Sequence, residues 1–364
     1  MKLPEGFLLS GMHCGLKKKK LDLGLIYVYG FGKAVGFFTK NRNPSYSILL
    51  SKKNINNPVK AILVNSGNAN CYSHPRGYKD TEDIAASLAD CLKVDKGSIL
   101  IASTGIIGRK LAKDKIIKNL PVLIKSLSKD CDDFAESLMT TDTFAKKAQI
   151  QLKFGQGRSA IAGFAKGAGM IYPDMATMLG FILTDIFIPG QAFKRIAREA
   201  VEESFNSISI DGCTSTNDNV LLISSRKMIL KKKCDIDRFK IELKRVCLKL
   251  AKMIVEDAEG ATKFVEILIK GAKTKLEAKR AGFSLANSNL FKCAIYGENA
   301  NWGRIIAALG QAGIKVKEDI KIKASDLKKK NISISIDLKR GKDSFAVYTS
   351  DLTPEYVKIN ADYS

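Results

Sequence analysis

The sequence predicts a protein of mixed α and β structure, the α+β class. Short apolar runs bounded by Gly, Asn or Pro alternate along the chain with longer stretches whose apolar residues recur every three or four positions. The length of 364 residues suits one large domain or two subdomains, and the hydrophobic content of 45% is that of an ordinary globular protein. No linker-like stretch and no internal repeat breaks this pattern.

The first half of the chain is expected to begin with strands, and no long helix is expected before about residue 79. The apolar runs place these strands at residues 23–29, 34–38, 47–50 and 59–64. The spacing of apolar residues then predicts a helix, a short strand, and two or three further helices up to about residue 139. The first helix and the strand are predicted at residues 81–92 and 98–102.

The second half alternates strand and helix. A buried strand is expected just after Thr177. The following strands are predicted at residues 220–225, 264–269 and 291–296. The helices between them are predicted at residues 189–205, 235–255, 273–285 and 304–310. Two late strands, at residues 332–336 and 345–348, are expected to form a hairpin.

The net charge of +23 raises nucleic acid as a partner. The lysine runs at residues 17–20, 231–233 and 328–330 are scattered and lack the interleaved aromatic residues of a base-stacking surface. We therefore interpret them as solvated faces and expect no nucleic-acid partner. The positive field can instead steer small anionic substrates toward the protein.

Neither a membrane span nor a metal site is expected. The apolar stretch at residues 167–193 carries Asp174 and several Gly and Pro residues, which a membrane helix would hardly tolerate. The eight cysteines show no Cys-x-x-Cys spacing and no cluster with histidine, so a zinc site and cysteine catalysis lack support. The first residues contain no signal-peptide core, so we expect a cytoplasmic protein with free thiols.

The most informative segment, residues 163–185, sets Thr177 behind a small alanine, between a Gly-rich run and an apolar run. A threonine hydroxyl is a poor nucleophile unless a base lies beside it, and a free α-amine on the same residue can be that base. Cleavage of the Ala176–Thr177 bond would create this amine. The alternative is a threonine that merely begins a strand. Of the usual triad types, Ser-His-Asp is disfavoured, because His13 and His74 belong to no nucleophile motif.

Three loops of small polar residues and glycine, at residues 65–70, 103–108 and 211–218, are candidates for an oxyanion-binding turn. Such loops offer backbone N–H groups and hydroxyls to a tetrahedral intermediate of acyl transfer. Each could instead be a simple tight turn or helix cap. No phosphate-binding loop or dinucleotide fingerprint is present, so nucleotide binding gains no support.

Taken in order, these motifs resemble the glutamate N-acetyltransferase (ornithine acetyltransferase) family of arginine biosynthesis. The resemblance includes Met-Thr-Thr-Asp-Thr at 139–143, Glu-Gly-Ala-Thr-Lys at 259–263 and Asn-Trp-Gly-Arg-Ile at 301–305. It also runs through residues 6–7, 65–70, 103–108, 166–178, 211–220 and 356–364, and so covers essentially the whole chain. Nine separated matches make chance agreement very rare.

The resemblance implies a DmpA-like fold of layered sheets flanked by helices, with self-cleavage between Ala176 and Thr177 into chains 1–176 and 177–364. Thr177 would be the nucleophile, and Thr104 and Gly105 the oxyanion-hole pair. The substrate-contacting positions that carry over are Thr140, Lys166, Thr177, Glu259 and Asn360. The family usually has a further Ser or Thr five residues after the asparagine, and Ser364 stands four after it. Cys213 also replaces an acidic residue common in the family.

The activity implied is transfer of acetyl from N2-acetyl-ornithine to glutamate by a ping-pong mechanism, with no cofactor and with acetyl-CoA as an optional second donor. A heterotetramer of two chains of each kind is implied as well. Two other hypotheses stay open at this point: a self-processing aminopeptidase or amide hydrolase, and a basic nucleic-acid-binding protein.

Overall fold

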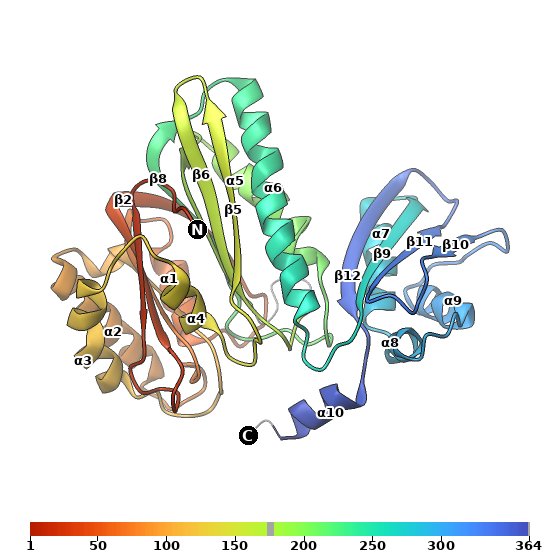
Figure 1. Cartoon of the computed structure of the whole chain (residues 1–364), viewed down its shortest axis with the longest axis horizontal. Coiled ribbons are helices and arrows are strands. Elements are labelled where there is room, and N and C mark those ends of the chain that lie inside the picture. The colour runs from red at the N-terminus through yellow and green to blue at the C-terminus, as the bar shows by residue number, and fades with distance from the viewer. Residues whose placement is uncertain (173–177, 363–364) are drawn as a thin grey trace. The chain divides into compact units, whose positions relative to one another are not determined.

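A computed structural model of the chain describes residues 1–172 and 178–362, which divide into two compact units (Figure 1). Unit 1 comprises Met1–Gly167, Asp174–Asn206 and Thr214–Ala251. Unit 2 comprises Ala168–Pro173, Ser207–Cys213 and Lys252–Ser364. Each unit has its own sheet and its own hydrophobic core, so the expected α+β class is confirmed.

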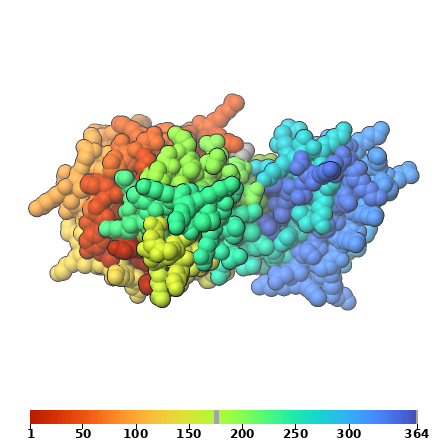
Figure 2. All heavy atoms as spheres, turned by 90° about the horizontal axis from the view of Figure 1, so that it is seen from above, coloured from red at the N-terminus to blue at the C-terminus, as the bar shows by residue number. Residues whose placement is uncertain are grey.

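Unit 1 is built on a sheet in which the described strands follow the order β4-β3-β2-β8-β7-β6-β5, with β1 also paired to β2. Segments far apart in sequence therefore pack together, as the mixed red and green regions of Figure 2 show. The strands are β1 (Phe7–Met12), β2 (Leu23–Phe38), β3 (Val59–Asn65), β4 (Ile99–Ser103), β5 (Lys146–Phe154), β6 (Gly157–Lys166), β7 (Leu179–Phe187) and β8 (Asn219–Ile229).

Strand β2 corrects the prediction of two separate strands. It is one strand of 16 residues, whose first half pairs with β3 and whose second half pairs with β8. The register shifts between Tyr27 and Gly32, and Gly30 has φ +72. The glycines that signalled a turn thus form an irregularity within the strand, which bends without ending.

The helices of unit 1 cover both faces of this sheet. They are α1 (Tyr46–Asn54), α2 (Gly77–Leu92), α3 (Lys113–Lys125), α4 (Asp132–Leu138), α5 (Ala192–Glu202) and α6 (Lys233–Glu256), of which the last turns of α6 belong to unit 2. Helices α1 and α2 pack against β4, whereas α4 packs against β1 and β2. Among the described residues, one apolar core includes Phe134 of α4 and another includes Leu88 of α2.

The strand expected at residues 47–50 is wrong, because α1 occupies it. Ser45 caps this helix by accepting the Ile48 amide at 3.4 Å. The Ser51 hydroxyl then bonds both backbone groups of Ile101 on β4, at 2.7 and 2.9 Å. The short apolar run was compatible with either structure, and the serine cap together with this tertiary contact decides for the helix.

Unit 2 consists of a four-stranded sheet covered by helices. The strand order is β10-β11-β9-β12, with β10 (Lys321–Ala324), β11 (Asn331–Asp337), β9 (Phe264–Ala272) and β12 (Asp343–Ser350). The helices are α7 (Lys275–Ala286), α8 (Asn289–Tyr296), α9 (Trp302–Gln311) and α10 (Pro354–Ala361). Helix α7 packs on β9 and β12.

Two predictions for unit 2 are wrong. The late strands do not form a hairpin, because β9 lies between them, parallel to β11 and antiparallel to β12. Residues 291–296 form a helix, α8, which Ser288 caps by accepting the Phe291 amide at 3.2 Å. Its apolar residues Phe291, Ala294 and Ile295 are buried on one side at helical spacing.

Other expectations from composition can be compared with the described residues. None of their helices is long and apolar enough to cross a bilayer. All eight cysteines are unbridged, as expected. The lysines at 231–233 and 328–330 are exposed, which agrees with solvated faces.

We expect Phe134→Ala to destabilise unit 1 by about 3–5 kcal/mol, because a fully buried aromatic ring leaves a cavity. Phe134 on α4 is 0% exposed, and its ring meets those of Phe164 and Phe181 edge-on at 5.2 and 6.0 Å. Denaturant unfolding followed by circular dichroism measures the change. Tyr29→Ala, at a position 57% exposed, is the control and should shift stability by less than about 0.5 kcal/mol. Equal effects of the two variants would contradict the packing described.

Candidate functional site

Two of the three predicted loops lie side by side at the ends of β3 and β4. These strands are parallel, so the loops that follow Asn65 and Ser103 leave the same edge of the sheet. The Ile106 amide donates to Gly67 O at 3.3 Å, and the Ala69 amide donates to Ile106 O at 3.0 Å. Residues 65–70 and 103–108 thus form one double turn.

Gly105 is required at the centre of this double turn. Its φ is +122, and a Cβ placed there would lie 2.3 Å from the carbonyl carbon of Gly67. Only glycine permits this backbone angle and this approach together. The Thr104 amide donates to Asn65 O at 3.0 Å, whereas no described residue bonds the Thr104 hydroxyl or the Gly105 amide. The turn therefore presents two unused donors next to each other, as an oxyanion hole requires.

The third loop is divided between the two units, and its part in unit 1 supports the double turn. In unit 1, the Asn217 side-chain amide donates to Ser103 O at 2.8 Å. In unit 2, Asp211 accepts the amides of Met170 and, at 2.9 Å, Ile171. Burial raises the pKa of Asp211, and these backbone amides oppose the rise.

Asp142 connects two of the predicted substrate-contacting positions. Its Oδ2 accepts the Thr140 amide at 2.9 Å, and its Oδ1 accepts both the Gly167 amide and Lys146 Nζ at 2.7 Å. Burial opposes ionisation of Asp142, but the charges of Lys166 and Lys146 outweigh it and hold its pKa well below the usual range. This carboxylate stood in the Met-Thr-Thr-Asp-Thr motif, yet its binding role could not be inferred without the fold.

Lys17 departs from its interpretation as part of a solvated run. It is half-buried, its Nζ donates to Leu21 O at 2.7 Å and to Met139 O at 2.6 Å, and its stem contacts Gly67. Burial lowers its pKa to about 8, against the opposing charge of Asp22. Lys17 therefore joins the double turn to the loop of Thr140.

Unit 2 brings Glu259 and Asn360 together, although they are 101 residues apart in the chain. The Asn360 side-chain amide donates to Glu259 Oε2 at 3.1 Å and to Tyr356 O at 3.0 Å. Helix α10 lies close against this turn: a Cβ placed on Gly260, which has φ +66, would lie 2.4 Å from Tyr356 N, and the Thr353 hydroxyl donates to Gly260 O at 2.6 Å. Asn360 thus lies on an ordered helix, although its position near the C-terminus is one where disorder is common.

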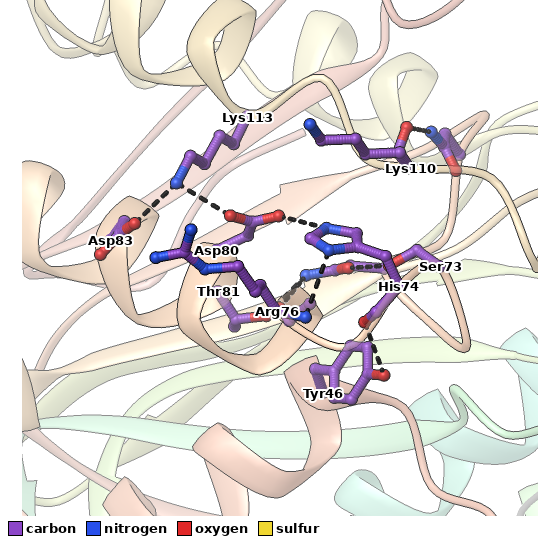
Figure 3. Close-up of polar contacts among 12 residues, drawn as sticks. Tyr46, Ser73, His74, Arg76, Asp80, Thr81, Asp83, Lys110 and Lys113 are labelled. Carbon is purple, nitrogen blue, oxygen red and sulfur yellow. Dashed lines mark hydrogen bonds and ion pairs between the residues drawn. The ribbon is translucent and has the colours of Figure 1, made fainter.

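A charged network fixes the start of α2 behind the double turn (Figure 3). Asp80 bonds His74 Nε2 at 2.7 Å and Lys113 Nζ at 2.8 Å, and Lys113 also bonds Asp83 at 2.7 Å. A cavity of about 510 Å³ opens beside these residues. The Asn70 side chain links the network to the turn by donating to Gly77 O and to Thr81 Oγ1 at 2.8 and 2.7 Å.

The structure therefore brings together Thr104, Gly105, Thr140 and Lys166 in unit 1 through shared neighbours, and Glu259 with Asn360 in unit 2. Ala176, Thr177 and Ser364 lie outside the described residues. Lys166 is 4% exposed at the end of β6, so it is not a surface lysine.

Comparison with known proteins gives matches over the full length. Residues 8–364 match the ArgJ family. A protein named arginine biosynthesis bifunctional protein ArgJ from Oceanobacillus iheyensis is 36% identical over 387 residues, which covers 99% of this chain and 95% of that protein. A protein of the same name from Syntrophotalea carbinolica is 40% identical over 391 residues, covering 99% and 98%.

Solved structures give partial matches. The crystal structure of arginine biosynthesis bifunctional protein argJ from Bacillus halodurans is 29% identical, covers 48% of this chain and 92% of that chain, and has a TM-score of 0.45. The structure of ornithine acetyltransferase complexed with ornithine from Mycobacterium tuberculosis is 29% identical, covers 47% and 92%, and has a TM-score of 0.43.

Gly105→Ala should lower the melting temperature much more than Gly108→Ala. Both glycines have positive φ, but a Cβ at Gly108 meets nothing within 4 Å, whereas at Gly105 it meets the Gly67 backbone. Backbone strain alone should cost about 1 kcal/mol at Gly108, and the clash should add at least about 2 kcal/mol at Gly105. Calorimetry of the two variants makes the comparison. The close contact of the two turns is refuted if both lose the same stability.

Asp80→Asn should destabilise the protein at pH 7 by about 1.5–3 kcal/mol, because a nearly buried carboxylate loses its charged partners. Burial opposes ionisation of Asp80, yet Lys113 and His74 lower its pKa. Its stabilisation is therefore complete above the unfolded pKa of about 3.9 and disappears as the pH falls through the lower folded pKa. Urea unfolding across pH 3–7 measures the difference, which should shrink toward acid. Glu355→Gln, which removes an exposed ion pair with Lys358, should show almost no difference at any pH.

Proposed function

The chain belongs to the ArgJ family, and we propose on that premise that it is an acetyltransferase of arginine biosynthesis. In the proposed reaction an acetyl group passes from N2-acetyl-L-ornithine to L-glutamate through an acetyl-enzyme. The observation that carries this proposal is the double turn, where neither the Thr104 hydroxyl nor the Gly105 amide has a partner among the described residues, so both can donate to an oxyanion.

The nucleophile in this proposal is the Thr177 hydroxyl, and cleavage of the Ala176–Thr177 bond frees the α-amine beside it. This amine is about half neutral at its reference pKa of about 7.7–8.0, and in the neutral form it takes the hydroxyl proton as Oγ1 attacks the acetyl carbonyl. When the carbon–nitrogen bond of acetyl-ornithine breaks, this proton passes to the departing ornithine nitrogen. The α-amine of glutamate then attacks the acetyl ester and gives a proton to the Thr177 amine. As the ester bond to Oγ1 breaks, the Thr177 amine returns this proton to Oγ1 and restores the hydroxyl.

The remaining groups stabilise charge and hold substrate. In other acyl-transfer enzymes each oxyanion donor contributes about 3–4 kcal/mol to transition-state stabilisation. Glu259 carries a negative charge suited to a substrate ammonium group. The proposed substrate contacts are Thr140, Lys166, Thr177, Glu259, Asn360 and Ser364. No cofactor takes part, because the threonine itself carries the acetyl group.

Cleavage would leave two chains, residues 1–176 and 177–364, that remain joined. Strand β6 of the first chain pairs with β7 of the second from Ile161–Thr184 to Lys166–Leu179, and the hydrogen bonds of this ladder do not depend on the broken bond. As in the family, we propose that two copies of each chain form a cytoplasmic heterotetramer. Acetyl-CoA is proposed as a second acetyl donor, which would make the enzyme bifunctional.

Thr177→Ala should abolish both self-cleavage and acetyl transfer. The purified wild-type protein should run as two bands on a denaturing gel, one of which begins Thr-Met-Leu-Gly on N-terminal sequencing. Mixed with acetyl-ornithine and glutamate, it should form acetyl-glutamate and ornithine, whereas the variant should stay whole and form neither.

Thr184→Val is the matched control, since it removes another buried threonine hydroxyl, bonded to Ala160 O at 2.9 Å on β7. This variant should be cleaved and active. An intact but active Thr177→Ala protein would refute the mechanism. Free acetate in place of acetyl-glutamate would identify a hydrolase, and salt-dependent retention on DNA or RNA would indicate a nucleic-acid-binding protein.

A further inference from the structure

The residue that follows Thr177 is held on both of its backbone groups by the start of β8. The Met178 amide donates to Asp218 Oδ1 at 2.8 Å, and Met178 O accepts the Asn219 amide at 3.2 Å. The parallel register of β7 and β8 continues this contact, with Leu179 opposite Asn219. Because consecutive Cα atoms are about 3.8 Å apart, a group that fixes Met178 acts within one residue of Thr177.

Asp218 itself is fixed on the opposite side and sealed from solvent. It is 1% exposed, and its carbonyl oxygen accepts the Thr39 amide at 2.9 Å. Among the described residues its Oδ2 has no hydrogen-bond partner. A fully buried carboxyl oxygen without a partner is rare in folded proteins and points to a functional constraint.

Burial raises the pKa of Asp218 well above its usual range, while the Met178 amide, the charge of Lys166 and the Ser215 amide oppose the rise only in part. The role visible in the structure is that of Oδ1 as an acceptor for the Met178 amide, which the side-chain oxygen of an asparagine can also fill.

We propose that Asp218 is a positioning residue for Thr177, which holds the Met178 amide so that the adjoining hydroxyl is aligned for self-cleavage and acyl transfer. This inference rests on the proposed function. It assigns Asp218 a role in alignment, and neither general-base chemistry nor a charge is required of it. A displacement of about 1 Å at a reacting group can slow a reaction about 100-fold, so loss of this hydrogen bond should be visible in rates.

The test compares Asp218→Asn with Asp218→Leu. Asparagine keeps the acceptor for Met178 but cannot ionise, whereas leucine has similar bulk and no polar atom. The rate of chain cleavage is followed on denaturing gels after synthesis of each full-length chain in a cell-free system. We expect Asp218→Asn to be cleaved within about threefold of the wild-type rate, and Asp218→Leu to be at least about 100-fold slower.

Asp185→Asn and Asp185→Leu are matched controls. Asp185 is a buried carboxylate at the other end of β7, and its Oδ1 accepts the Ala160 amide at 3.1 Å. These controls should lose stability but cleave at the wild-type rate. If Asp218→Leu does not fold, as judged by circular dichroism, Asp218→Ser replaces it, because serine is smaller and too short to reach Met178.

Each outcome is decisive. Slow cleavage of a folded Asp218→Asn protein would show that an ionisable carboxyl is needed and would overturn the positioning role. Wild-type cleavage of both Asp218 variants would overturn it as well, while leaving the proposed function intact. If the wild-type chain itself stays whole, the proposed function fails and this inference fails with it. For processed Asp218→Asn, an unchanged kcat and an unchanged pH profile for acetyl transfer are also expected.

Discussion

The register of three neighbouring strands is the constraint on which the candidate site in unit 1 depends. Lys166 on β6 lies opposite Leu179 on β7, and Leu179 lies opposite Asn219 on β8. A slip of one residue would turn every side chain of a strand to the other face of the sheet. The register is secured by buried residues on both faces of β7, from Leu179 to Ile186. The ends of these three strands are therefore fixed relative to one another by the sheet and its buried core.

Buried positive charge is the second feature of unit 1. Lys146 is 1% exposed and Lys166 is 4% exposed, and both lie around the carboxylate of Asp142, with half-buried Lys17 close by. Burying charges is unfavourable unless partners compensate them. The carboxylate of Asp142, the nearby charge of Asp22 and the backbone carbonyls that accept from Lys17 contribute to this compensation.

The sequence alone predicts most elements but not every pairing. Helix α6 and strand β3 follow from long or strongly apolar patterns, whereas Thr104 and Gly105 are proposed as an oxyanion pair only because the family resemblance implies them. The strands expected at residues 47–50 and 291–296 are helices, because short apolar runs fit both structures and the serine caps Ser45 and Ser288 favour the helix. The hairpin fails for a different reason. Only tertiary packing places β9 between β11 and β12.

The functional residues that the sequence does not reveal are those whose role arises from three-dimensional contacts. Lys17 stands in a run of four lysines, yet it alone among them is half-buried and bonded to backbone carbonyls. Asp142 and Asp218 lie within motifs that the sequence displays, but their carboxylate oxygens accept hydrogen bonds from backbone amides 25 and 40 residues away in the chain. No local pattern encodes such a distance, because it depends on which strands pair.

In the double turn, the structural and the proposed chemical role belong to different groups at Thr104 and to the same group at Gly105. At Thr104 they separate: the amide is used by Asn65, so it maintains the turn, and only the hydroxyl is left for chemistry. At Gly105 they coincide, because the backbone angle that allows contact with Gly67 also leaves the amide without a partner in the described chain. A side chain at position 105 would therefore disturb the fold and the donor together. At position 104 a side chain without the hydroxyl removes the donor while the turn persists, so the proposed oxyanion role can be examined there without loss of the fold.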